Sequence, residues 1–153
     1  MSKENNLKNL VNRSFRDPIA AILLKNSNIT AIQYESLVID YLSDNLTDHE
    51  LTYKNKALLR SKKVSRGSYS RTLSQARRNI ISSIYTLLLL GYIGIFDTAP
   101  FDEYKDLADK LREYLDLIQS LDSTQSRQFL QRMEKELMEG VRALAETRSL
   151  KTM

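Results

Sequence analysis

Apolar residues recur at spacings of three and four along most of this chain, which is the period of helices that bury one side. The first clear case begins at Asp17-Pro18, where an N-cap aspartate and a first-turn proline precede the apolar run 19–24. Thr30 and Gln33 then have the spacing of a capping box and predict the start of a second amphipathic helix. The apolar stripe of this second helix consists of Tyr34, Leu37, Val38, Tyr41 and Leu42.

Two further helices are predicted between residues 47 and 91. The capping-box pattern is repeated from Thr47 to Glu50, and it predicts a helix that runs to about Lys62. The inward-facing residues of this helix are expected to be Leu51, Leu58 and Leu59. Ser65 is then the N-cap of a longer helix that ends near Gly91. The apolar stripe of the longer helix consists of Tyr69, Leu73, Ala76, Ile80, Ile84 and Leu87.

The stretch 79–96 carries no charge, so a membrane span has to be weighed against a helix that packs on protein. Its polar residues gather on one helical face and leave apolar residues on the other, which favours the helix that packs on protein. Those polar residues are Asn79, Ser82, Ser83 and Thr86. The short apolar segment 92–96 has the composition of a single strand, although no second strand with a hairpin signal follows it.

Beyond residue 98 the pattern changes to heptad seams. The first seam consists of Tyr104, Leu107, Leu111, Tyr114, Ile118 and Leu121. Asp122-Ser123-Thr124 then ends one helix and caps the next, whose seam consists of Leu130, Met133, Leu137, Val141 and Leu144. Two such helices either fold back on each other as a hairpin or pack against a second copy of the chain. Both arrangements stay open, and we prefer the dimer.

Charge is distributed unevenly along the chain. Residues 1–50 carry five Lys/Arg and seven Asp/Glu, and residues 97–153 carry nine Lys/Arg and twelve Asp/Glu. Residues 51–96, which we call the basic segment, carry nine Lys/Arg and no acid, although the net charge of the chain is only +4. Cations crowded in this way repel one another unless a polyanion neutralises them, which indicates nucleic acid as the partner.

Composition argues against several kinds of chemistry. The chain has no cysteine, and its one histidine, His49, lies within a capping box that reads as a helix start. The sequence contains neither a glycine-rich phosphate loop nor a metal-ligand cluster, so we expect no enzyme, no metal site, no cofactor and no small-molecule ligand. Residues 1–12 are polar and lack the apolar stretch of a secretory signal, which favours a cytoplasmic protein.

The run 58–73, Leu-Leu-Arg-Ser-Lys-Lys-Val-Ser-Arg-Gly-Ser-Tyr-Ser-Arg-Thr-Leu, resembles the turn and recognition helix of helix-turn-helix DNA-binding domains. With its flanking helices, the resemblance extends over roughly residues 30–95. Val64 would fill the junction of the two helices, and Ser65 would cap the second helix, whose first backbone amides bind phosphate well. The chain departs from the family pattern at Lys63, where glycine is usual, and at Leu59, where a small residue is usual. A second register resembles winged-helix proteins, with a wing at 92–96.

The predicted contact surface follows from the helical period, because Tyr69 and Leu73 point inward. The base-facing residues on the opposite side are expected to be Arg66, Ser70, Arg71 and Ser74. The phosphate-contacting residues around them are expected to be Lys54, Lys56, Lys62, Lys63, Ser65, Arg77 and Arg78. Tyr69 and Tyr85 have the ring chemistry to stack on single-stranded bases, but their places on apolar stripes favour packing in the core.

The sequence thus predicts an all-α protein, with a helix-turn-helix domain over residues 1–96 and a two-helix segment over residues 97–153 that forms a hairpin or coiled coil. The expected function is binding of double-stranded DNA as a homodimer joined through its C-terminal helices, without membrane contact. The protein would act as a transcriptional regulator or as a nucleoid component. Two alternatives stay open. One is an adaptor whose acidic hairpin binds another protein, and the other is an RNA-binding subunit of a ribonucleoprotein.

Overall fold

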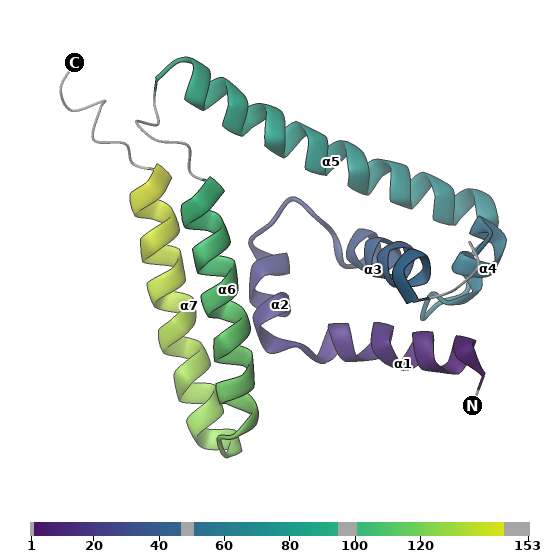
Figure 1. The fold of residues 1–153 in the computed structure, drawn as a ribbon, viewed down its shortest axis with the longest axis horizontal. Coiled ribbons are helices and arrows are strands. Elements are labelled where there is room, and N and C mark those ends of the chain that lie inside the picture. The colour runs from purple at the N-terminus through teal and green to yellow at the C-terminus, as the bar shows by residue number, and fades with distance from the viewer. Residues whose placement is uncertain (1, 47–50, 95–100, 146–153) are drawn as a thin grey trace. The chain divides into compact units, whose positions relative to one another are not determined.

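The computed structural model describes residues 2–46, 51–94 and 101–145, which form seven α-helices and no strand (Figure 1). The prediction of an all-α fold is therefore confirmed for these ranges. The chain divides into two compact units, Met1–Ser83 and Ile84–Met153. The sequence pattern changes near residue 96, but the division by compactness falls within the long helix α5 (Arg66–Tyr92). The predicted strand or wing at 92–96 has no counterpart in residues 92–94, and residues 95 and 96 lie outside the described ranges.

The chain begins with two helices joined at one residue. α1 (Lys3–Arg16) and α2 (Pro18–Lys25) meet at Asp17, whose Oδ1 accepts hydrogen bonds from two backbone amides at the start of α2. The predicted aspartate cap and first-turn proline are therefore confirmed. No apolar stripe predicted α1, because it contributes only Leu7 and Val11 to the core.

Helix α3 (Ala31–Leu46) lies in the middle of the first unit, in contact with α1 and α4 (Figure 1). Its predicted capping box is present, because the amide of Thr30 donates to Gln33 Oε1 and the amide of Gln33 donates to Thr30 Oγ1. The predicted stripe is only half-buried, and Tyr41 is exposed. The fully buried positions of α3 include Ile39, Ser36 and Ser43, because other elements pack around this helix on several sides.

Helix α4 (Tyr53–Leu58) is shorter than predicted. It begins after the N-cap Thr52, whereas the start predicted at 47–50 lies outside the described residues. It ends at Leu58 because the amide of Ser61, which a continuing helix would pair with a carbonyl four residues back, donates instead to Glu35 Oε1. The inward positions are corrected accordingly: Leu59 is buried, but Leu58 is exposed.

The core of the first unit forms around α3. It consists of Leu7, Val11, Ile39, Ala57, Leu59, Tyr69 and Leu73, from α1, α3, the α4 region and the first half of α5. Tyr69 is fully buried, donates its hydroxyl hydrogen bond to the carbonyl of Ser36 at 3.2 Å, and meets the ring of Tyr53 edge to face. After Ala76 no other described element buries the predicted apolar stripe of α5: Ile80 and Ile84 are exposed.

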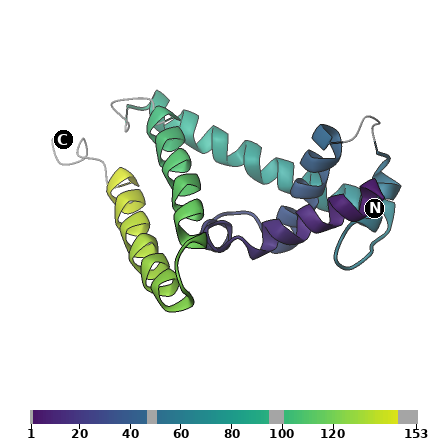
Figure 2. The same ribbon diagram turned by 60° about the horizontal axis from the view of Figure 1, so that its bottom comes forward.

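The two C-terminal helices, α6 (Phe101–Gln119) and α7 (Ser123–Ala145), lie side by side and antiparallel (Figures 1 and 2). Asp122 caps α7, because its Oδ1 accepts a hydrogen bond from the amide of Gln125. The predicted end of one helix and start of the next at 122–124 are therefore confirmed. The buried residues of the pair are Leu111, Ile118 and Met133, and the rings of Tyr114 and Phe129 meet edge to face. Leu111, Ile118 and Met133 of the two seams are therefore buried within one chain, whereas Val141 is exposed and the side chain of Leu144 is not among those described.

The contrast between Leu58 and Leu59 gives a test of the register of α4. Leu59→Ala should lower the free energy of unfolding by about 2 to 5 kcal/mol, because it leaves a cavity in the core. Leu58→Ala removes an exposed side chain and should change it by less than about 0.5 kcal/mol. Urea unfolding of both variants measures the difference. Equal losses would contradict the register described here.

Candidate nucleic-acid interface

Three cations of the basic segment are neutralised within the protein by acids of α3. The most buried of them is Lys56, whose side chain is 3% exposed and whose Nζ donates to Asp40 Oδ1 and Asp44 Oδ1, both at 2.8 Å. Burial lowers the pKa of Lys56, but the hydrogen bonds to the two carboxylates outweigh burial and raise it overall. Lys56, which the sequence suggested as a phosphate contact, is thus buried and already paired with two acids, so it does not belong to the exposed cations of the segment.

The second internal cation is Arg60, which lies just after α4 and forms a buried ion pair with Glu35. Arg60 Nε donates to Glu35 Oε2 at 2.9 Å, while the other oxygen of Glu35 accepts the amide of Ser61. One carboxylate of α3 thus satisfies a guanidinium and a backbone amide of the segment that follows α4.

The third cation, Arg77, is only half-buried. Its Nη2 donates to Asp40 Oδ2 at 2.8 Å, so Asp40 binds both Lys56 and Arg77. A hydrogen bond to Tyr53 and the nearby charge of Asp40 raise the pKa of Arg77 further above its usual value. Arg77 keeps an exposed guanidinium edge, but part of its charge is already balanced, which weakens its predicted role at a phosphate.

The other six cations of the basic segment are exposed. They are Lys54, Lys62, Lys63, Arg66, Arg71 and Arg78. None of the six forms an ion pair within the part of the chain that the structure describes, and Arg78 donates a hydrogen bond to Gln75 on its own helix. Nine cations minus three that pair with α3 leaves these six without an acidic partner among the described residues.

The first half of α5 presents a polar face opposite its core-facing stripe. At 100° per residue, Arg71, Ser74 and Arg78 share this face, and all three are exposed. Ser70 is half-buried on the flank, and Arg66 lies about 140° around the helix from Arg71. The four predicted base-facing residues therefore do not share one face, and Arg78, predicted as a phosphate contact, lies in line with Arg71.

Arg71 also borders an open groove of about 530 Å³ between the start of α3 and the first half of α5. The groove is lined by Thr30, Ile32, Gln33, Ser68, Arg71, Thr72 and Gln75. Asn79 ties the two helices together next to it, because its Nδ2 donates to Gln33 Oε1 and to the carbonyl of Asn28. Sequence reasoning missed this lining, since the groove joins residues about forty positions apart.

The start of α5 has the predicted cap. Ser65 Oγ accepts the amide of Ser68 at 3.1 Å, and the carbonyl of Ser65 accepts the amide of Tyr69. The connection from α4 to α5 covers the seven residues 59–65, which is longer than the three- or four-residue turn of a helix-turn-helix. Lys62 and Lys63 lie on this connection and are exposed, next to the capped helix start.

The two tyrosines weighed as base-stacking residues lie in different surroundings. Tyr69 is fully buried, and burial is the main reason that its pKa lies well above its usual value, with Asp40 adding to the shift. Its packing in the core matches the interpretation preferred from the sequence. Tyr85 is exposed in the distal half of α5, so it does not belong to a core.

Sequence reasoning also missed Glu35, Asp40 and Asp44 as partners of the basic segment. The sequence did contain an indication of these partners, because the predicted helix that precedes the acid-free segment carries three acids. Among the described residues there is no group of three or more His, Cys, Asp or Glu placed to hold a metal ion. None of the described helices combines the length and the apolar character that crossing a membrane requires.

Comparison of the chain with models of known protein families, with curated proteins and with solved structures finds no match. The function therefore has to be argued from the surface and its charges.

The buried phenol of Tyr69 predicts a loss of stability in alkali. Its pKa in the folded protein lies above the unfolded value of 10.0, so the folded state retains the proton and unfolding becomes easier as pH rises past about 10. The free energy of unfolding should fall by up to about 1.4 kcal/mol per pH unit from this group. Urea unfolding from about pH 9 to about pH 11 measures it. Tyr69→Phe should reduce this slope, and an unchanged slope would contradict the assignment to Tyr69.

The contrast between Lys56 and Lys54 separates structural from ligand-binding cations. Lys56→Ala leaves Asp40 and Asp44 without their shared partner and should lower the free energy of unfolding by about 2 to 4 kcal/mol. Lys54→Ala, on the exposed side of the same short helix, should change stability by less than about 0.5 kcal/mol. Chemical denaturation at neutral pH compares the two, and equal effects would mean that Lys56 is not held by the α3 acids.

Proposed function

We propose that this protein binds double-stranded DNA through the exposed cations of the basic segment. The observation that carries the proposal is that Lys54, Lys62, Lys63, Arg66, Arg71 and Arg78 have no acid in their segment and no ion-pair partner among the described residues. A phosphate backbone supplies the missing negative charge and releases its counterions on binding.

The pairing within the first unit sharpens this proposal. If the acids of α3 neutralised all the cations of the segment, its positive charge would need no external partner. They reach only three of the nine cations, and those three are the ones that hold α4, its following turn and α5 against α3. The six others are all exposed: Lys62 and Lys63 lie on the connection 59–65, and the rest lie on α4 and α5.

Arg71, Ser74 and Arg78 support α5 as the element that enters a groove of the duplex. Arginine has the fork geometry for the major-groove edge of guanine, and serine bonds to bases or phosphates. Lys62, Lys63 and Arg66 lie near the start of α5, where exposed cations and backbone amides favour phosphate. Under this proposal the protein is a transcriptional regulator or a nucleoid component, related to helix-turn-helix proteins by the use of its helix and not by the length of its turn.

Salt dependence of binding tests the proposal. With phosphate contacts from the four exposed cations other than Arg71 and Arg78, log Kd for a random-sequence duplex should rise with log salt concentration with a slope of about 3.6. The triple variant Lys62→Ala/Lys63→Ala/Arg66→Ala should bind more weakly and lose about 3 from this slope. Fluorescence anisotropy across a salt series measures both quantities.

The matched control removes three exposed cations from α7, in the variant Arg127→Ala/Arg132→Ala/Lys135→Ala. It makes the same change in net charge and should keep the wild-type slope. Equal weakening in the two triple variants would show that only total charge matters, and no binding at low salt would refute the proposal. Tighter binding to an RNA duplex of the same length would instead assign the surface to RNA.

A further inference from the structure

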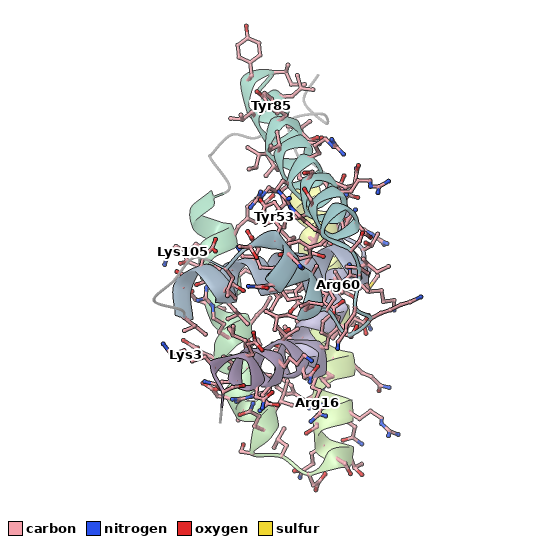
Figure 3. All side chains as sticks on the ribbon, turned by 90° about the vertical axis from the view of Figure 1, so that its right-hand side faces the viewer. Lys3, Arg16, Tyr53, Arg60, Tyr85 and Lys105 are labelled. Carbon is pink, nitrogen blue, oxygen red and sulfur yellow. The ribbon has the colours of Figure 1, made fainter. Side chains whose placement is uncertain are left out.

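The distal half of α5 carries a solvent-facing seam of large apolar residues. Ile81, Tyr85, Leu88 and Tyr92 follow one another at spacings of four, three and four, and they are 51, 68, 54 and 91% exposed. Figure 3 shows the ring of Tyr85 pointing outward from the helix. We call these four residues the distal seam. Spacing of this kind keeps the side chains on one side of a helix and is the pattern by which one helix packs along another.

The distal seam continues the polar face of the first half of α5. Arg71, Ser74 and Arg78 precede Ile81 at spacings of three, four and three, so one uninterrupted face changes from basic to apolar along the helix. The core-facing stripe, with Tyr69 and Leu73, lies on the other side. The apolar half of the face is therefore not the continuation of the side that packs in the first unit.

The exposed area is large enough for a stable interface. The four side chains of the distal seam are 51 to 91% exposed, and together they present roughly 500 Å² of apolar surface. This is at the upper end of the largest patch on an ordinary monomer. A standard interface buries roughly 800 Å² on each partner, of which somewhat more than half is apolar.

The chemistry of the seam fits a second copy of the same helix. Residues 79–94 carry no charge, so the surface offers nothing for a charged partner to complement, and two copies meet without repulsion. A heptad-spaced seam is matched best by a helix with the same spacing. Leu111, Ile118 and Met133 of the α6–α7 pair are already buried, so those seams do not need a second chain.

We propose that two copies of this chain associate through the distal seam of α5. This surface differs from the C-terminal helices that the sequence pattern favoured for dimerisation. The inference goes beyond DNA binding and stands without it, because it rests on apolar surface and not on the cations. If the protein both binds DNA and dimerises through the distal seam, the dimer contains two copies of α5. Its two basic halves can then contact one duplex.

The first test is the mass of the protein in solution, by size-exclusion chromatography with light scattering over a concentration series. Wild type should show twice the mass of one chain, and Leu88→Glu should weaken the dimer by about a hundredfold, because it places a charge in the apolar interface. The matched control is Leu117→Glu, which introduces the same charge at an exposed leucine of α6, 47% exposed against 54% for Leu88. This control should remain a dimer, and circular dichroism checks that both variants fold.

The outcomes separate the possible occupants of the seam. A monomeric wild type overturns the inference and assigns the seam to another part of this chain or to a different protein. Dissociation by Leu117→Glu but not by Leu88→Glu also overturns it and moves the interface to the C-terminal helices. The triple variant Lys62→Ala/Lys63→Ala/Arg66→Ala should remain a dimer, so failure of DNA binding and failure of dimerisation are read independently.

A second measurement does not depend on a disruptive charge. The chain has no cysteine, so Tyr85→Cys introduces a single thiol into the seam, and a short bis-maleimide should link two copies through it. Tyr41→Cys on α3 is the matched control, because Tyr41 is 67% exposed and Tyr85 is 68% exposed. Efficient linking at residue 85 and not at residue 41 supports the inference, whereas equal yields would contradict it.

Discussion

The pairing of buried cations with the acids of α3 is the constraint on which the first unit depends. A lysine or arginine leaves water only where carboxylates replace its hydration, and Glu35, Asp40 and Asp44 provide this for the buried Lys56 and Arg60, while Asp40 also pairs with the partly exposed Arg77. These bonds attach α4, its following turn and α5 to one central helix. The same constraint decides which cations lie on the outer surface, because those that the three acids do not reach stay exposed without an ion-pair partner among the described residues.

The sequence predicted the elements whose starts depend on neighbouring residues. Asp17, Thr30 and Ser65 cap helices through amides two or three positions away, so their role is readable from a short stretch of chain. The role of Lys56 was not readable in this way, because its partners lie 12 and 16 residues away on another helix. A count of charges along the chain gives buried and exposed cations the same weight, and it therefore overstated the charge that faces outward.

The helical period of the apolar residues predicted only part of the candidate site on α5. It identified the side of α5 that faces the core at Tyr69 and Leu73, and hence the exposed side at Arg71 and Ser74. It did not indicate where the core ends, because apolar residues continue on both sides of α5 after Ala76. It also did not predict α1, whose polar sequence contributes only two core residues. In both cases the burial of a residue depends on whether another helix packs against it. A pattern within one stretch of sequence does not contain that information.

Because α5 is one uninterrupted helix, its basic and apolar stretches are held in a fixed rotational phase. One residue inserted after Arg78 would turn Ile81 and everything beyond it by about 100° relative to Arg71. Seven inserted residues would nearly restore the phase but would move the two stretches apart by about 10.5 Å. A length change in a flexible loop carries no such rotational penalty. We therefore expect the number of residues between Arg71 and Tyr92 to vary less during evolution than the identities of those residues.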